Sequence, residues 1–314
     1  MPETVNHDWA RPAVILVATD LSDLDRLMPH AFEQAAASGG RLLLLHALAA
    51  IGAVSLEGGD LPYYDVAGAI EAAGKVLQPW CEAAHRRGIQ CDALVREGLA
   101  THEILVAVRQ FQVDRVIVGT RSRSKLGKLL VGSVAEQVLR SVNLPVLTVG
   151  PEAHLQDASG DERVVLLATT LRETSRPGAA LACRIASDQK ARLILLHVLP
   201  PLDETARKHL PQELDSAAMR ELRQLAEETG AHCGIAIDSL VAHGNPSIEI
   251  LAEASACRAS LIILGVRQRS AFEDLALDRT VYRVLAHARC PVLTLREPQP
   301  MPAELHTEVM GAHH

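Results

Sequence analysis

The same order of apolar runs and polar loops occurs twice along this chain of 314 residues. The run Val14–Ala18 recurs as Val164–Ala168, and Leu42–Ala47 recurs as Leu193–Val198. A repeat of about half the chain is too long for a solenoid and is typical of a duplicated domain. We therefore expect two related domains with a linker and a flexible tail: domain one at residues 10–150, the linker at 151–162, domain two at 163–297 and the tail at 298–314.

Within each half, short Val- and Leu-rich runs alternate with segments of helical length. Strands separated by helices predict a parallel sheet with right-handed crossovers. Each half is therefore expected to be an α/β, doubly wound (Rossmann-like) domain with a five-stranded parallel sheet flanked by helices. The first and fourth strands should be neighbours, and such sheets bind ligands at the carboxyl ends of their strands. For the first half we predict strands at 14–18, 42–47, 90–95, 115–118 and 145–149, and helices at 23–38, 66–87, 101–111 and 133–142.

Composition argues against two classes of partner. The formal net charge of −7 argues against general nucleic-acid binding. No apolar run reaches the length that spans a membrane, and the start Met1–Thr4 lacks the basic and apolar regions of a signal peptide. We therefore expect no nucleic-acid partner, no membrane contact and a cytoplasmic location.

The six cysteines are scattered and form no C-x-x-C pair, which argues against a disulfide framework and a structural zinc site. Cys81 and His85 lie four residues apart on a predicted helix, with Cys91 nearby, so a metal site there is conceivable. We interpret the three instead as a half-buried helix face, and expect no metal.

The loop after the fourth strand of the first half has the features of a phosphate site. Gly119 follows a buried strand, and Gly132 and Ser133 open a helix thirteen residues later. Backbone N–H groups and the positive dipole end at a helix start suit an anion, and glycine permits close approach of the backbone. The residues between carry only positive charge: Arg121, Arg123, Lys125 and Lys128.

The corresponding loop of the second half has lost these features. Its basic residues are balanced by acidic ones, and Asp278 replaces the equivalent of Gly132. A carboxylate there would repel a phosphate and occupy the same N–H donors. The sequence therefore predicts an anion site in the first half and none in the second.

This pattern resembles the nucleotide-binding subgroup of the universal stress protein family, specifically its tandem members. That subgroup carries Gly-x-x-Gly, nine residues, and then Gly-Ser or Gly-Thr, and Gly119 and Gly132–Ser133 match at the right distance. Asp20 matches the family's acidic residue near the nucleotide, and Ala47 occupies the usual adenine-contacting place. The resemblance covers nearly the whole chain apart from the termini and the linker.

The sequence departs from the family pattern at a few positions. In the first half, Ser122 replaces the second glycine, and Ala100 stands where proline is usual in the turn that begins at Gly98. The second half keeps that turn as Gly244-Asn245-Pro246. It departs from the family pattern elsewhere: Thr170 stands at the acidic position, Gln268 at the second-glycine position, and Asp278-Arg279 at the Gly-Ser position.

The resemblance implies a regulatory protein of the stress response that binds ATP, with or without Mg²⁺, in its first domain without efficient catalysis. A slow ATPase or adenylyl-transfer enzyme is one alternative, and a nucleotide-free interaction scaffold is another. No catalytic residue is assigned. The resemblance to the family implies the following nucleotide contacts: Ala18, Thr19, Asp20, Ala47, Gly119, Thr120, Arg121, Ser122, Arg123, Gly132, Ser133 and Val134.

Members of the family pair through their last strands. Residues 145–149 and 291–295 could therefore meet within one chain as an internal pseudo-dimer, because fusion raises the effective concentration of the partner domain. Two such chains could pair again as a homodimer. We also expect a protein partner for a regulator of this kind, which the sequence does not identify.

Three polar residues at strand ends have competing interpretations. Asp20 is a nucleotide contact, an N-cap of the following helix, or both. His46 and His197 occupy equal places at the ends of apolar strands, and we expect core histidines bonded to the backbone.

Overall fold

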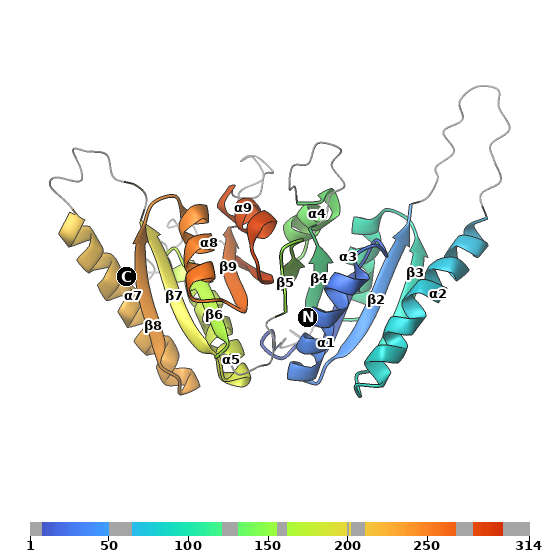
Figure 1. The fold of residues 1–314 in the computed structure, drawn as a ribbon, viewed down its shortest axis with the longest axis horizontal. Coiled ribbons are helices and arrows are strands. Elements are labelled where there is room, and N and C mark those ends of the chain that lie inside the picture. Colours follow the sequence, from blue (N-terminus) through green and yellow to red (C-terminus); the bar gives the residue numbers. More distant parts are fainter. Residues whose placement is uncertain are drawn as a thin grey trace, which may run out of the picture.

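The first half of the chain alternates strand and helix as predicted (Figure 1). The computed structural model describes residues 8–49, 65–120, 131–155, 162–199, 201, 211–267 and 279–297. The predicted boundaries agree with the structure to within two residues. The elements are β1 Val14–Ala18, α1 Leu24–Ser38, β2 Arg41–Leu48, α2 Val66–His85, β3 Cys91–Glu97, α3 Ala100–Gln110, β4 Arg115–Gly119, α4 Ser133–Ser141 and β5 Val146–Val149.

The second half repeats this order. It adds a short 3₁₀ turn, η1, before its first helix. Its elements are β6 Val164–Ala168, η1 Glu173–Ser175, α5 Arg176–Gln189, β7 Arg192–Leu199, α7 Pro211–Cys233, β8 Ile237–His243, α8 Pro246–Ala256, β9 Leu261–Arg267, α9 Arg279–His287 and β10 Val292–Glu297.

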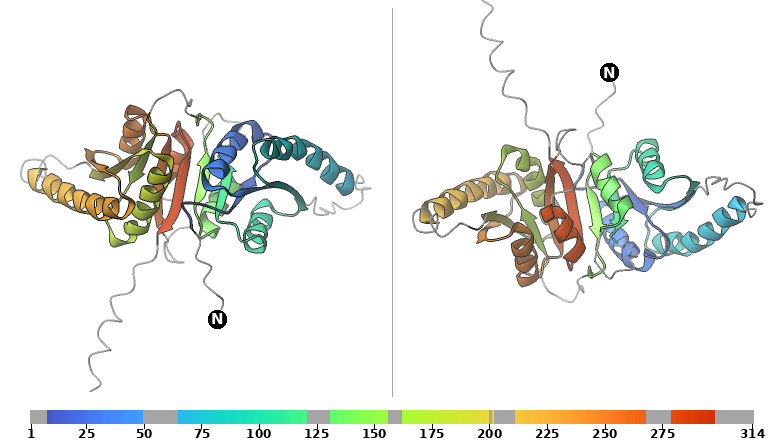
Figure 2. Two further views of the ribbon diagram at one scale, coloured as in Figure 1. Left: turned by 90° about the horizontal axis from the view of Figure 1, so that it is seen from below. Right: turned by 90° about the horizontal axis from the view of Figure 1, so that it is seen from above.

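All ten strands form one sheet in the order β3-β2-β1-β4-β5-β10-β9-β6-β7-β8. Each half contributes five parallel strands, and β1 lies beside β4 as expected. The halves join where β5 and β10 pair antiparallel, with Leu147 opposite Leu293 (Figure 2). The predicted pairing of the last strands within one chain is therefore confirmed.

Helices cover both faces of the sheet because successive strand residues point to opposite sides. Leu42 and Leu44 pack with α1, α2, α5 and α7 in one hydrophobic core. Leu43 and Leu45 pack with α3, α4, α8 and α9 in the other. Both cores run across the two halves. In the described ranges, no helix combines the length and apolarity needed to cross a bilayer.

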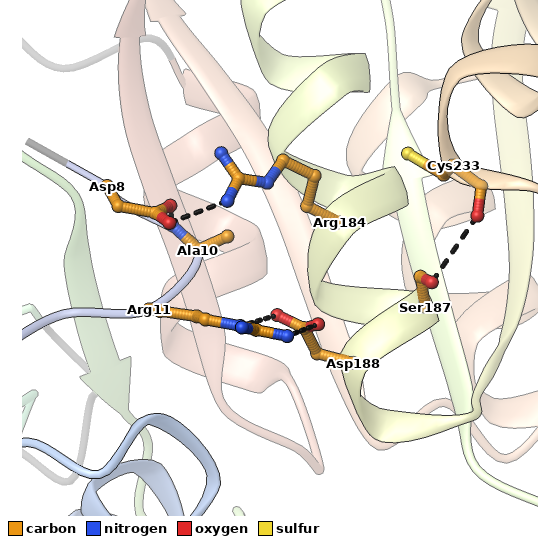
Figure 3. Close-up of polar contacts among 7 residues, drawn as sticks. All are labelled: Asp8, Ala10, Arg11, Arg184, Ser187, Asp188 and Cys233. Atoms are coloured by element: carbon orange, nitrogen blue, oxygen red, sulfur yellow. Dashed lines mark hydrogen bonds and ion pairs between the residues drawn. The ribbon is translucent and has the colours of Figure 1, made fainter.

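The segment before β1 also ties the halves together (Figure 3). Arg11 donates from Nε and Nη2 to the two carboxylate oxygens of Asp188 on α5, at 2.8 and 2.5 Å. Arg184, also on α5, donates to Asp8 Oδ2 at 2.6 Å. The Arg11 guanidinium lowers the pKa of Asp188 through this hydrogen bond. These side chains therefore add polar contacts between the halves to those of the sheet.

Candidate functional site

A cavity of about 250 Å³ lies at the carboxyl ends of β1, β2 and β4, beside the start of α4. This is the edge of the sheet where ligands were expected. Its walls come from five separate segments of the first half. They are lined by Ala18, Thr19, Asp20, Asp23, Leu45, His46, Ala47, Ala100, Ile104, Val118, Gly119, Gly132, Ser133, Val134 and Ala135.

The turn after β1 exposes Asp20 at the cavity. Leu21 has a φ of 71°, a left-handed conformation that is uncommon for leucine. The chain turns there, and Asp20 accepts hydrogen bonds from the N–H and the hydroxyl of Ser22, at 2.8 and 2.6 Å. The N-cap position of α1 belongs to Asp23, whose side chain makes no capping bond. The N-cap interpretation of Asp20 is therefore wrong, because the left-handed turn places it before the helix start.

Asp23 is a cavity residue that sequence reasoning missed. It is only 7% exposed and accepts a hydrogen bond from the Thr19 hydroxyl at 2.6 Å. Burial raises the pKa of Asp23, and the Thr19 bond opposes that shift. A Cβ on Gly119 would lie 2.5 Å from Asp23 Oδ2 and 2.9 Å from Arg26 Nη2. A side chain at position 119 would therefore have to displace the side-chain ends of Asp23 and Arg26.

The start of α4 presents backbone N–H donors to the cavity. Gly132 is the N-cap residue, with φ −62° and ψ 148°, and it offers no side chain to cap the helix. The first residues of the helix, Ser133, Val134 and Ala135, all line the cavity. Backbone N–H groups at a helix start lack intrahelical partners, and the helix dipole is positive at this end. The arrangement suits an anionic group.

Histidines occupy equal places in the two halves, and both are bonded to the backbone as expected. His46 Nδ1 lies 2.9 Å from Thr19 O, and His197 Nδ1 lies 2.8 Å from Thr169 O. His46 also lines the cavity.

The structure brings most of the predicted contacts together. Eight of them line the cavity, namely Ala18, Thr19, Asp20, Ala47, Gly119, Gly132, Ser133 and Val134. Thr120 is 2% exposed and donates its N–H to Val149 O at 3.2 Å, so it is buried beside β5 and is not a lining residue. The predicted contacts Arg121, Ser122 and Arg123 lie outside the described residues, as do Lys125 and Lys128.

The second half keeps the turn after its first strand, without the acid. Thr170 replaces Asp20, and its hydroxyl lies 3.1 Å from Ser175 Oγ. Leu171 has a φ of 58°, like Leu21 in the first half. Gln268 and Asp278 lie outside the described residues, so the loss of an anion site there remains a prediction.

A larger cleft of about 880 Å³ lies on the second half, between α5 and α7. Its arginines are already paired with carboxylates: Arg11 with Asp188, Arg184 with Asp8, and Arg176 with Glu228 at 2.5 Å. The uncapped helix start and the exposed acid make the smaller cavity the better candidate site.

Known proteins resemble this chain in sequence and in fold. A universal stress protein of Mycolicibacterium smegmatis is 26% identical over 302 residues, which cover 90% of this chain and 96% of that protein. A shorter one from Thermus aquaticus is 29% identical over 135 residues, covering 43% of this chain and 98% of its own length. The crystal structure of a universal stress protein from Archaeoglobus fulgidus has the same fold, with a TM-score of 0.69 and 21% identity over 91% of this chain and 99% of that one.

The family model of the universal stress proteins matches this chain twice, at residues 13–150 and 162–296. The two matches correspond to the two halves of the ten-stranded sheet. The chain therefore belongs to the universal stress protein family and carries two of its domains in tandem.

Proposed function

We propose that the chain binds ATP, or another adenine nucleotide, in the cavity of its first half and acts as a stress-response regulator without efficient catalysis. The observation that carries this proposal is the uncapped start of α4, which faces a cavity at the carboxyl ends of the strands. The second half would then be a partner domain without nucleotide.

The cavity is lined by both polar and apolar groups. The N–H groups at Ser133 and Val134 would receive phosphate oxygens, next to a loop whose charged residues are all basic in sequence. Apolar side chains on the strands, such as Ala47 and Val118, would contact the adenine ring. Such a pairing of an apolar wall with a few placed donors is typical of cofactor sites.

Magnesium would have one available carboxylate. Asp20 is exposed at the cavity, whereas Asp23 is buried, bonded to Thr19 and has a raised pKa. Mg²⁺ is usually held by one or two carboxylates together with substrate phosphates. Asp20 therefore fits as the protein ligand of a phosphate-bound Mg²⁺.

Two titratable groups of the cavity, His46 and Asp23, are held in place by the turn after β1. His46 is held through Nδ1 by the Thr19 carbonyl, and Asp23 is held by the Thr19 hydroxyl. Both groups are thus engaged by the turn that builds the cavity.

The test is calorimetric titration of ATP, with and without Mg²⁺, into the wild-type chain and Gly132→Asp. The substitution copies the aspartate of the second half into the first. Gly132 has an extended backbone conformation that any residue adopts, and aspartate is a favourable N-cap, so the fold should be retained. We expect one site per chain, and an affinity lower by about 100-fold or more in Gly132→Asp.

The matched control is Asn245→Asp, which adds the same charge at the start of α8 in the second half and preserves the capping bond to Ser247. Its ATP affinity should equal that of the wild type. No heat with wild type, and no nucleotide released on denaturation, would contradict the proposal and favour the scaffold. ATP turnover at ordinary enzyme rates that Gly132→Asp abolishes would favour the enzyme.

A further inference from the structure

Two cysteine thiols meet between α2 and β3. Cys81 Sγ and Cys91 Sγ lie 2.7 Å apart, and the residues are 8% and 5% exposed. Both are free thiols. Cys81 lies in the last turns of α2 and Cys91 is the first residue of β3, so a short helix–turn–strand return brings them together.

The backbone around this pair is fixed by its own hydrogen bonds. Ile89 N donates to Ala84 O at 3.0 Å, and Leu42 N donates to Gln90 O at 2.8 Å. Cys91 N donates to Nε2 of His85, an exposed residue one helical turn after Cys81. The two thiols are therefore held in contact by the fold itself.

The contact makes the two thiols unequal. A hydrogen bond from Cys91 lowers the pKa of Cys81, because it stabilises the Cys81 thiolate. The same bond, together with burial, raises the pKa of Cys91. Cys81 is thus the better nucleophile of the pair, since the thiolate is the reactive form of cysteine.

We propose that Cys81 and Cys91 form an oxidisable dithiol that a hydroperoxide converts into a disulfide between α2 and β3. The Cys81 thiolate attacks one peroxide oxygen, the O–O bond breaks, and Cys81 becomes a sulfenic acid as the leaving oxygen takes a proton. Cys91 then attacks the Cys81 sulfur, and the sulfenic hydroxyl leaves as water with the Cys91 proton. With hydrogen peroxide, two thiols and one peroxide give one disulfide and two waters. An external thiol returns the pair to its reduced form.

This dithiol lies away from the nucleotide cavity. Cys91 begins β3 and pairs with Leu42 at the start of β2, whereas the cavity is formed at the other end of β2, by Leu45 to Ala47. The disulfide should therefore form whether or not the chain binds ATP. Its failure and the failure of the proposed function are separate results.

The first test is peroxide treatment of the folded wild-type chain, alkylation of the remaining thiols, and peptide mapping without reductant. Arg86 and Arg87 lie between the two cysteines, so trypsin releases them on separate peptides, residues 76–86 and 88–96. We expect these peptides to be joined after oxidation and separated again by dithiothreitol. Unlinked peptides, or either one joined to a different cysteine, would overturn the proposal.

The second test resolves the order of the two steps. In Cys91→Ser, the resolving thiol is gone, and dimedone should trap a sulfenic acid on Cys81. In Cys81→Ser, Cys91 should remain unlabelled at the same peroxide concentration. Equal labelling of the two variants would contradict the assigned roles.

Cys290→Ser is the matched control for removing a buried thiol. Burial raises the pKa of Cys290 to about 12, and this residue lies just before β10 in the other half. The 76–86 and 88–96 peptides should still be joined in this variant. If Cys290→Ser abolished the link, the pairing of Cys81 with Cys91 would be disproved.

Discussion

The two halves have the same strand-end turn but different chemistry on it. Thr19 N donates to Leu45 O at 3.0 Å, and Thr169 N donates to Leu196 O at 2.9 Å. The histidine bonded to each threonine carbonyl is also present in both halves. Because the second half has Thr170 in place of the acid, the conformation of this turn does not depend on the acid. The backbone of the turn belongs to the fold, and the two halves differ in the side chains it carries.

The first helices of the halves differ in their buried polar groups. In α1, His30 is 3% exposed, whereas α5 contains no histidine. Burial, together with the positive charge of Arg26 and the nearby His154, lowers the pKa of His30 to about 4. The first half should therefore be the more acid-sensitive of the two.

The largest expected effect is on stability in acid. The unfolded chain binds a proton at His30 near its ordinary pKa of 6.5, and the folded chain only near 4. Above pH 6.5, neutral His30 makes its full contribution to the free energy of unfolding. As the pH falls toward 4 this contribution is lost, and the free energy of unfolding decreases by about 3 kcal/mol in total. Urea unfolding of the wild type and His30→Leu between pH 7.5 and 4 measures the difference.

Other groups titrate in the same range, so the quantity to compare is the slope of unfolding free energy against pH. His30→Leu should have a shallower slope than the wild type between pH 6.5 and 4. Parallel curves for the two proteins would mean that His30 is not the acid-sensitive group of the first half.

A smaller destabilisation is expected when the glycine of an equivalent turn in either half is replaced by alanine, and it should be equal in the two halves. Gly98 and Gly244 have φ angles of 148° and 146°, and an added Cβ would lie 2.7 Å from Glu103 Oε1 and 2.5 Å from Glu249 Oε1. Gly98→Ala and Gly244→Ala should therefore each lower the free energy of unfolding by about 2 kcal/mol. Urea unfolding measures both.

Gly74→Ala is the matched control, because Gly74 lies within α2 and an added Cβ would point into open space. Alanine there should stabilise the chain by up to about 1 kcal/mol. If Gly98→Ala and Gly244→Ala differed strongly, the structural equivalence of the two turns would be disproved.

The smallest effect concerns the contacts between the halves. Asp188→Asn removes the ion pair with Arg11, which is largely exposed, so only a slight fall in Tm is expected. The fall should shrink further at high salt because exposed charges are screened. Thermal unfolding at low and high salt checks this expectation. The control is Glu71→Gln, which breaks the exposed Glu71–Lys75 pair within α2. A large, salt-independent fall in Asp188→Asn would show that this contact holds the halves together.

The fold was predictable from the sequence because its signals are local. Apolar runs of strand length and helix-ending glycines, such as Gly39 with its φ of 70°, mark the elements directly. The junction of the halves was predicted from the family resemblance, because members of that family pair through their last strands. Eight of the twelve predicted contacts line the cavity because motif spacing fixes where strand ends and helix starts meet.

What the sequence did not predict depends on contacts between distant residues or on unusual backbone angles. The turn at Leu21 is left-handed without a glycine, so the placement of Asp23 in the cavity had no local signal. The cysteines looked scattered because ten residues of sequence separate Cys81 from Cys91, and only the return of β3 along α2 closes that gap. The Arg11–Asp188 pair joins opposite halves, where sequence spacing carries no information.

The junction of β5 and β10 also changes how substitutions act on the molecule. In a symmetric dimer of identical chains, each substitution occurs twice across the interface. Here Arg296 at the end of β10 donates to Asn143 Oδ1 at 2.7 Å and to the carbonyl of Arg140, whereas the corresponding position after β5 is Gly150. The residues on the β5 side and on the β10 side of this junction can therefore change independently of each other. Duplication within one chain allows one half to lose a binding site while the other keeps it, without giving up the shared sheet.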